Sequence, residues 1–429
     1  AALSSLPRPL FHYFYQRFAE VTNPPIDPLR EAQVMSLNQR LGRRSSLLSR
    51  GPEVARMVEL ASPVLTDEHM QVIREIRHHL PTGRGDDFQA VTLDSTWPVG
   101  DGVDGLEDAV KRLCQQAVAA VKSGASLLIL SDRGLNQERT LIPALLALSA
   151  VHQRLIQAGV RNQASLISET GEARDVHHVA ALVGFGASAV NPWLALQTVQ
   201  DEVRTAGRHA EGVSAVQAAD NFCKALEKGL LKIMSKMGIA TVDSYCGAQI
   251  FDALGLAEEV VERYFPGTPA RLGGLGLRRI AADVLTWHHV AYPDGGAQAA
   301  LESYGLFKFK RDGEYHAYNP DVVRALHELV GIGKIAAGKG KGNLEKRRGT
   351  AGEEDAEGVL ETGLSDGYRR YAELVQRRPV ANLRDLLDFT TRRAPVALDE
   401  VEPAEAILRR FSTAAMSHGA LRGIPHETL

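Results

Sequence analysis

The sequence is poor in cysteine, and its few cysteines lie far apart. Only Cys114, Cys223 and Cys246 occur in 429 residues, and no two of them form a CxxC pair. Their spacing excludes a disulfide framework and a cysteine-rich zinc or iron–sulfur site built from these residues. We expect all three thiols to be reduced and buried, as free cysteines usually are.

Long apolar runs and an excess of one charge are also missing. A typical apolar tract, Leu141–Val151, is well short of the roughly 18 residues that cross a bilayer. The net charge of −3 gives no overall attraction to nucleic acid or to anionic membranes, so neither is expected as a primary partner. Arg8, His12 and Arg17 interrupt the aromatic-rich start, which does not read as a signal peptide. We therefore expect a cytoplasmic protein.

The middle of the sequence alternates short apolar runs with amphipathic stretches. The runs expected to be strands are Phe88–Leu93, Ala125–Leu130, Ala164–Ser168 and Ala187–Val190, with Ile239–Val242 as a further one. The stretches expected to be helices are Gly105–Ser123, Ile142–Ala158 and His177–Val183. Apolar strands separated by helices predict an α/β fold with a mostly parallel sheet and flanking helices on both faces.

Polar residues follow these strands at their carboxyl ends. They are Asp94, Asp132, Arg133, Glu169 and Asn191. Because parallel strands end at the same edge of a sheet, these side chains should gather on one rim, where such folds usually bind ligands. One interpretation is a small-molecule pocket. The other is structural, because polar residues after strands also cap helices and form ion pairs in loops.

The regions after this sheet carry weaker signals. Lys224–Gly238 is basic and amphipathic, which favours a helix facing the core. Gly267–Gly276 is glycine-rich and is expected to be a loop. Gly331–Gly358 is rich in glycine and lysine and then acidic, which predicts a surface loop with little to bury. No HExxH spacing is present, so no metal site is expected.

Longer segments of the sequence resemble the large subunit of glutamate synthase, and they occur in the same order as in that family. The matching segments are Pro9–Phe14, Gln16–Pro28, Leu130–Gly134, Glu169–Glu172, Val176–His178, Ala189–Pro192, Lys224–Ile239, Ser244–Phe251, Gly313–Pro320, Tyr371–Val375 and Leu383–Leu387. The resemblance covers nearly the whole chain and is more specific than any short motif in it.

The resemblance implies a domain order. Residues 1–290 are similar to the family's central α/β domain, and residues 305–429 to the start of its FMN-binding domain. That second part would be mainly helical and an incomplete β/α barrel, with residues 331–358 as a flexible insertion. The family's glutaminase, with its terminal cysteine nucleophile, and most of the barrel would lie outside these residues.

The resemblance also bears on cofactors. The family uses FMN and a three-iron four-sulfur cluster, whose cysteines come later, so no cofactor or metal is expected in this chain alone. Met416 and Ser417 resemble the end of the first barrel strand and are the candidates for facing FMN or substrate. No residue is assigned a catalytic role. Cys246 stands where relatives commonly carry arginine.

Two functions follow from different classes. The first is a segment of glutamate synthase, which makes two glutamates from glutamine, 2-oxoglutarate and reductant. This segment would link the glutaminase and FMN domains and help form the ammonia channel, and it would be inactive alone. The alternative is a stand-alone β/α protein that binds a small carboxylate at the rim through Asp132, Arg133, Glu169 and Asn191. A third idea makes the lysine-rich tract a contact for an acidic partner such as the small subunit or ferredoxin.

Overall fold

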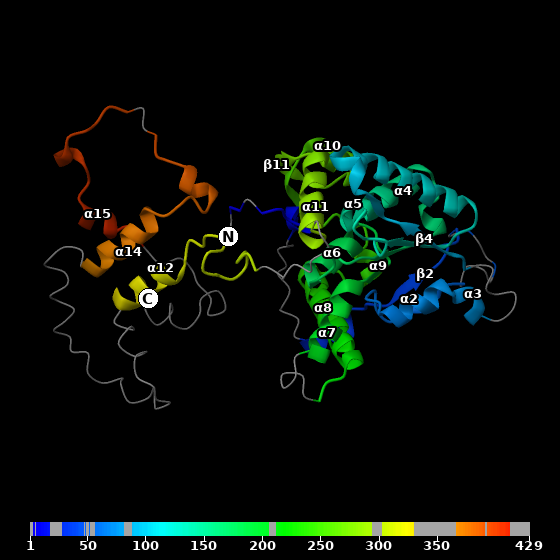
Figure 1. Cartoon of the computed structure of the whole chain (residues 1–429). Helices are drawn as coiled ribbons and strands as arrows, with labels where there is room; N and C mark the ends of the chain where they lie inside the picture. Colours follow the sequence, from blue (N-terminus) through cyan, green and yellow to red (C-terminus); the bar gives the residue numbers. More distant parts are fainter. Residues whose placement is uncertain are drawn as a thin grey trace. The chain divides into compact units, whose positions relative to one another are not determined.

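The chain folds into two compact units. The computed structural model describes residues 3–4, 6–17, 28–46, 48, 51, 56–80, 88–205, 212–293, 303–329, 366–390 and 393–411. Unit 1 consists of Ala1–Ser5 and Glu302–Leu429, and unit 2 of Leu6–Leu301 (Figure 1).

A four-stranded parallel sheet forms the centre of unit 2. Its order is β4-β6-β8-β9, built from Ala90–Asp94, Leu127–Ser131, Ser165–Glu169 and Ala189–Asn191. Every neighbouring pair is parallel. The mixed α/β class with a parallel sheet, predicted from the apolar runs, is confirmed.

Helices cover both faces of this sheet. Leu128 and Leu130 of β6 belong to the main core, whereas Leu127 and Ile129 belong to a second core cluster on the opposite face. The main face is covered by α4 (Gly105–Lys122), α5 (Ala144–Gln157) and α6 (Val176–Gly184), and the other by α2 (Asp67–Arg74) and α3 (Ile76–His79) (Figure 1). A strand buried on both sides has no polar alternation, which is why β6 reads as a continuous apolar run.

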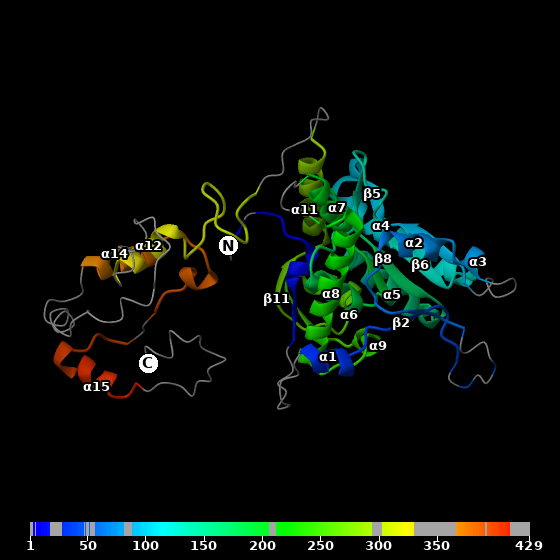
Figure 2. The same ribbon diagram turned by 90° about the horizontal axis from the view of Figure 1, so that it is seen from below.

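A helical layer packs next to α6. It contains α1 (Pro28–Val34), α7 (Trp193–Thr205), α8 (Ala215–Met237) and the short α9 (Val242–Tyr245), with α7 and α8 side by side (Figure 2). Leu226, Leu230 and Met234 of α8 are buried, so the amphipathic stretch does face the core. The predicted strand Ile239–Val242 is wrong, because Thr241 caps α9 through its side chain and the helix begins at Val242.

A second sheet, of order β1-β10-β11, joins distant parts of unit 2. Its strands are Phe14–Gln16, Phe251–Leu256 and Ala270–Leu275, and α10 (Glu258–Tyr264) and α11 (Leu277–Ala291) follow β10 and β11. The loop predicted for Gly267–Gly276 is therefore wrong over β11. A Cβ on Gly274 would lie 2.2 Å from the carbonyl oxygen of Gly255, so here the glycine permits a close strand contact rather than marking a turn.

Short elements complete unit 2. Two antiparallel ribbons pair β2 (Gln39–Leu41) with β3 (Val58–Leu60), and β5 (Thr96–Pro98) with β7 (Arg139–Leu141). The 3-10 turns are η1 (Leu10–Tyr13), η4 (Val99–Asp104) and η5 (Arg161–Gln163). No described helix of the chain is long and apolar enough to cross a membrane.

The regular elements described in unit 1 are all helices, joined by irregular stretches, and they bury little. Its elements are α12 (Pro320–Leu329), α14 (Asp366–Gln376), α15 (Ala404–Leu408), η9 (Leu383–Leu386) and η10 (Leu398–Glu400). Its apolar side chains that are more than half exposed are Phe307, Tyr318, Leu383, Leu386, Leu387, Phe389, Val396, Leu398, Leu408 and Phe411. The predicted insertion at 331–358, together with Met416 and Ser417, lies outside the described residues.

Candidate functional site

The strand ends of the parallel sheet bring the predicted polar residues into one row. In register, Asp94 stands opposite Ser131, Ser131 opposite Glu169, and Glu169 opposite Asn191. This is the edge at which open α/β sheets usually hold their ligands. We call Asp132, Arg133, Glu169 and Asn191, with the groups that contact them, the rim cluster.

Glu169 is the centre of the rim cluster. Its side chain is fully buried and accepts hydrogen bonds from Arg74 Nη2 at 2.6 Å, Arg133 Nε at 2.7 Å and Ser131 Oγ at 2.5 Å. Burial acts to raise the pKa of Glu169, but these hydrogen bonds outweigh it and hold the pKa below its ordinary value. The residue is a carboxylate at neutral pH, compensated by two guanidinium groups.

Arg133 and Asn191 connect the rim cluster to α2. Arg133 Nη2 donates to Asp67 Oδ1 at 2.5 Å, and its guanidinium lies 4.9 Å from the Trp193 ring centroid. Asn191 Nδ2 donates to the Leu65 carbonyl at 2.9 Å and to Asp67 Oδ1 at 3.2 Å. Because the contacts with Asp67 and Leu65 join strand ends to the α2 region, the cluster fastens the smaller core to the sheet.

Asp132 is buried beside this network and has its own donors. Its oxygens accept from Thr170 Oγ1 at 2.6 Å, from Trp193 Nε1 at 2.6 Å and from the Gly171 backbone N–H at 3.0 Å. Burial raises the pKa of Asp132, although these hydrogen bonds oppose the rise. The residue fixes the loop after β8 and the first turn of α7.

Asp94 belongs to a different group. It accepts from Arg139 Nη2 at 2.8 Å and from Thr96 Oγ1 at 2.7 Å, both on the small ribbon beyond β4. The row of strand ends is therefore continuous in register, but the contacts divide it. The structure brings Asp132, Arg133, Glu169 and Asn191 into one neighbourhood and places Asp94 in another.

Glu172 adds a group that titrates near neutral pH. Its Oε2 accepts the backbone N–H of Ala144 at 2.6 Å, at the start of α5, where Pro143 supplies no side-chain cap. Burial, helped by the negative charge of Asp132, raises the pKa of Glu172 to about 7. The carboxyl therefore caps a helix that its own sequence neighbourhood leaves uncapped.

The arrangement leaves little for an external ligand. Both arginines already bind Glu169, and Arg133 also binds Asp67, so a phosphate or carboxylate would have to displace an acid of the protein. The rim cluster thus does not fit the phosphate of a flavin. Among the described residues of the cluster, the one buried side-chain atom without a hydrogen-bond partner is Asn191 Oδ1.

The cysteines offer no alternative chemistry. Burial raises the pKa of Cys114 to about 11 and of Cys223 to about 12, and it also raises the pKa of Cys246. Thiols that stay protonated are poor nucleophiles. No group of three His, Cys, Asp or Glu side chains within the described ranges is arranged to hold a metal ion.

Sequence reasoning missed several partners in this region. Asp67 and Arg74 lie on α2, and Thr170 and Trp193 follow β8 and β9. Thr170 and Trp193 adjoin residues that were singled out, so their position was a usable signal. Nothing in the sequence places Asp67 and Arg74 near β8, because the contact depends on how α2 crosses the sheet.

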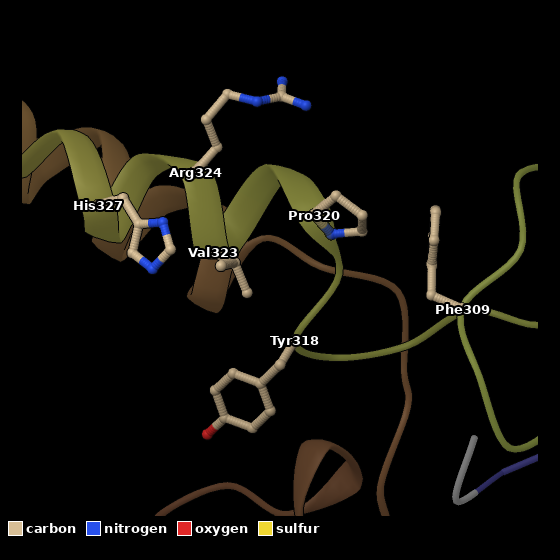
Figure 3. Close-up of a pocket in the computed structure, with 6 residues that line it drawn as sticks. All are labelled: Phe309, Tyr318, Pro320, Val323, Arg324 and His327. Atoms are coloured by element: carbon tan, nitrogen blue, oxygen red, sulfur yellow. The ribbon is translucent and has the colours of Figure 1, made fainter. Parts of the chain in front are cut away.

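Unit 1 contains an open groove of about 460 Å³ beside α12 (Figure 3). It is lined by Phe309, Tyr318, Pro320, Val323, Arg324 and His327. In Figure 3, Val323 and His327 leave α12 toward Tyr318, whereas Arg324 extends away from it. Small-molecule sites generally require polar groups that converge on one point, and the polar groups of this groove do not. We call this feature the Phe309 groove.

Comparison with known families identifies the class. The model of the glutamate synthase central domain matches residues 1–257, and that of a conserved region in glutamate synthase matches residues 357–429. The first match alone covers more than half of the chain. The chain belongs to the glutamate synthase family.

Individual relatives agree with this assignment. Ferredoxin-dependent glutamate synthase 2 of Synechocystis sp. is 41% identical over 100% of this chain and 26% of its own length. The NADPH glutamate synthase large chain of Bacillus subtilis is 39% identical over 100% of this chain and 25% of its own. The chain therefore spans about a quarter of these relatives. They favour the family interpretation over the alternative of a stand-alone metabolite-binding protein.

Solved structures add little. A mutant flavocytochrome b2 with benzoylformate matches with a TM-score of 0.34 and 10% identity, covering 68% of this chain and 84% of that one. A score this low does not indicate a common fold.

Proposed function

We propose that this chain is the central segment of a glutamate synthase, joining a glutaminase domain to an FMN-binding domain. The complete enzyme would convert glutamine, 2-oxoglutarate and reductant into two glutamates. The observation that carries the proposal is the order of the two family regions along a chain that resembles glutamate synthases over its whole length.

The proposed domains are residues 1–290, the central α/β domain, and 305–429, the start of the FMN-binding domain. The exposed apolar side chains of unit 1 support this division, because the part of it that the structure describes buries too few of them to form a core. Met416 and Ser417 remain candidates for the FMN side of the first barrel strand. A cytoplasmic location remains a prediction from the sequence.

Within the enzyme, the segment would act as a scaffold and help wall the ammonia passage. The rim cluster supports a scaffold role, since its acids and arginines are bound to one another. A role in the reaction chemistry has no comparable support: the described thiols are protonated at neutral pH, and the two rim arginines are engaged. The chain alone should therefore bind no FMN and show no activity.

A chimera tests the proposal. The matching segment of the Bacillus subtilis large chain would be replaced by these 429 residues. We expect glutamine-dependent glutamate formation to be retained, with the ammonia passed on rather than released. A chimera with a normal flavin spectrum and normal glutaminase activity that releases its ammonia to solvent would contradict the proposal. Stoichiometric flavin on the isolated chain would contradict it as well.

Thermal shifts test the alternative of a rim ligand. 2-Oxoglutarate, glutamate and glutamine would each be added to the isolated chain and to its Arg133→Lys variant. The scaffold role predicts no rise in melting temperature with any of them. A rise that disappears in the variant would show a binding site at the rim.

A further inference from the structure

The Phe309 groove is apolar and open to solvent. Tyr318 is 69% exposed, Phe309 44% and Val323 39%. Exposed aromatic rings beside a concave surface are characteristic of places where one protein anchors a side chain of another. The cavity of about 460 Å³ is large enough for one or two such side chains.

A short basic strip, Phe307–Arg311, forms one border of this groove. Its sequence is Phe307-Lys308-Phe309-Lys310-Arg311, and all five residues are exposed. None of the three cations forms an ion pair within the part of the chain that the structure describes. The strip therefore places uncompensated positive charge next to an apolar surface.

The loop that carries the strip is closed by its own contacts. His316 Nε2 is 2.6 Å from the Gly305 carbonyl oxygen, and Glu314 N donates to the Tyr304 carbonyl at 2.8 Å. Gly313 is needed for this closure, because a Cβ there would lie 2.6 Å from the Tyr304 oxygen. The strip is thus held in one conformation, which lowers the entropic cost of binding to it.

The geometry points to a docking site for an acidic protein segment that inserts an apolar side chain into the Phe309 groove. The apolar lining would bury the anchor, and Lys308, Lys310 and Arg311 would attract the acidic residues around it. Unpaired lysines at the border favour a separate acidic partner over an apolar covering, because lysine is depleted in the cores of stable interfaces.

Nucleic acid is the less suitable occupant. Acidic residues follow the strip at Asp312 and Glu314 and recur at Asp321 and Glu328, so the positive surface is short. Binding to a phosphate backbone depends on several neutralised phosphates in a row. The groove itself contributes nothing to such contacts, whereas an apolar anchor would use it.

The test uses the 429-residue chain and a synthetic glutamate-rich peptide with a central Leu-Phe pair. Fluorescence anisotropy of the labelled peptide would follow binding at low and moderate salt. We expect micromolar affinity that weakens as salt is added. A peptide with Ser-Ser in place of Leu-Phe should bind about tenfold more weakly, because it lacks the anchor.

Variants of the chain separate the two contributions. The double change Lys308→Glu and Lys310→Glu should weaken binding at least about tenfold. Phe309→Ser, on the loop, and Val323→Asp, on α12, should each remove the preference for the Leu-Phe peptide. If one of these variants does not fold, the other still tests the groove. The matched control reverses two charges elsewhere, with Lys224→Glu and Lys228→Glu on the exposed side of α8. It should leave the affinity for the peptide unchanged.

Several results would overturn the docking site. Equal affinity for the Leu-Phe and Ser-Ser peptides would show that the groove is not used. An equal loss in the α8 control would show that any lysine pair suffices. Tighter binding of a single-stranded oligonucleotide than of the peptide would assign the strip to nucleic acid. The outcome does not depend on the proposed enzyme, since the isolated chain is tested against a defined peptide.

Discussion

The rim cluster of unit 2 and the Phe309 groove of unit 1 use charge in opposite ways. At the rim, Glu169 is buried and bound by Arg74 and Arg133, so its charge is used within the fold. At the groove, Lys308 and Lys310 face solvent beside exposed aromatic rings. The comparison teaches that a conspicuous set of charged residues at strand ends can be structural, while a less conspicuous exposed strip is free to meet a partner.

The two units also differ in how they bury apolar groups. Unit 2 has a parallel sheet with a core on each face. The described part of unit 1 buries few apolar residues, among them Val322, Ala325 and Ala381. Unit 2 should therefore unfold cooperatively, whereas the stability of unit 1 should depend on what covers it. Substitutions in both units test this contrast.

Glu169→Ala should lower the free energy of unfolding of unit 2 by about 2–3 kcal/mol, because it removes the buried acceptor shared by Ser131, Arg74 and Arg133. Urea titration followed by circular dichroism would measure this. Glu138→Ala, an exposed acid on the neighbouring loop, is the matched control. A loss of stability no larger than that of the control would mean that the rim cluster does not stabilise unit 2.

Glu172→Gln should change how stability depends on pH. The folded-state pKa of Glu172 is about 7, above the ordinary value of 4.5, so the folded chain binds this proton more tightly than the unfolded chain. Its stabilising contribution is present below pH 4.5 and is lost as the pH rises through 7. Relative to wild type, the variant should gain roughly 2 kcal/mol between pH 5 and pH 8. Parallel pH–stability curves would contradict this assignment.

Trp193→Phe should cost about 1–2 kcal/mol, because it removes the donor to Asp132 Oδ1 and replaces the indole beneath Arg133 with a smaller ring that attracts the guanidinium less strongly. A double-mutant cycle with Asp132→Ala, which removes the acceptor, would isolate the coupling between the two side chains. A coupling energy of about 1 kcal/mol is expected. Strict additivity of the two single changes would show that the two side chains act independently.

Leu387→Ser should change stability by less than about 0.5 kcal/mol, because Leu387 of unit 1 is 76% exposed. The fully buried Leu128 of β6 provides the contrast, and Leu128→Ala should cost about 2–5 kcal/mol. Thermal unfolding of both variants would measure the difference. A large loss from Leu387→Ser would show that this surface of unit 1 is covered, which would remove the contrast between the units.

The sequence was most informative where local chemistry decides structure. Ala125–Leu130 predicted a buried strand because six apolar or small residues stand between turn signals, and β6 occupies nearly the same position. Ile239–Val242 has a similar pattern but is not a strand, because the Thr241 side chain accepts the backbone N–H of Ser244 and caps a helix. Gly274 looked like a loop residue, yet it lies in β11 because Gly255 approaches it closely. Such contacts join residues that are distant in sequence, so local patterns do not contain them.

The candidate site followed the same rule. Register alone placed Asp132, Arg133, Glu169 and Asn191 at one edge, because parallel strands end together. Whether those groups face a ligand or one another depended on Arg74 and Asp67 of α2, whose position over the sheet is a tertiary property. Residue type and strand position could predict that these side chains lie close together. They could not predict that the side chains would already be bound to other groups of the protein.

The pairing of β1 with β10 sets an order for folding during synthesis. Phe14 leaves the ribosome well before its partner Ala253 is made. The four parallel strands are complete once Asn191 has emerged, so they can pair while β1 still waits for β10 and β11. Among the described strands of unit 2, β1 is therefore one of the last to enter a sheet, and any delay between Asn191 and Leu275 prolongs the time for which Phe14 is exposed.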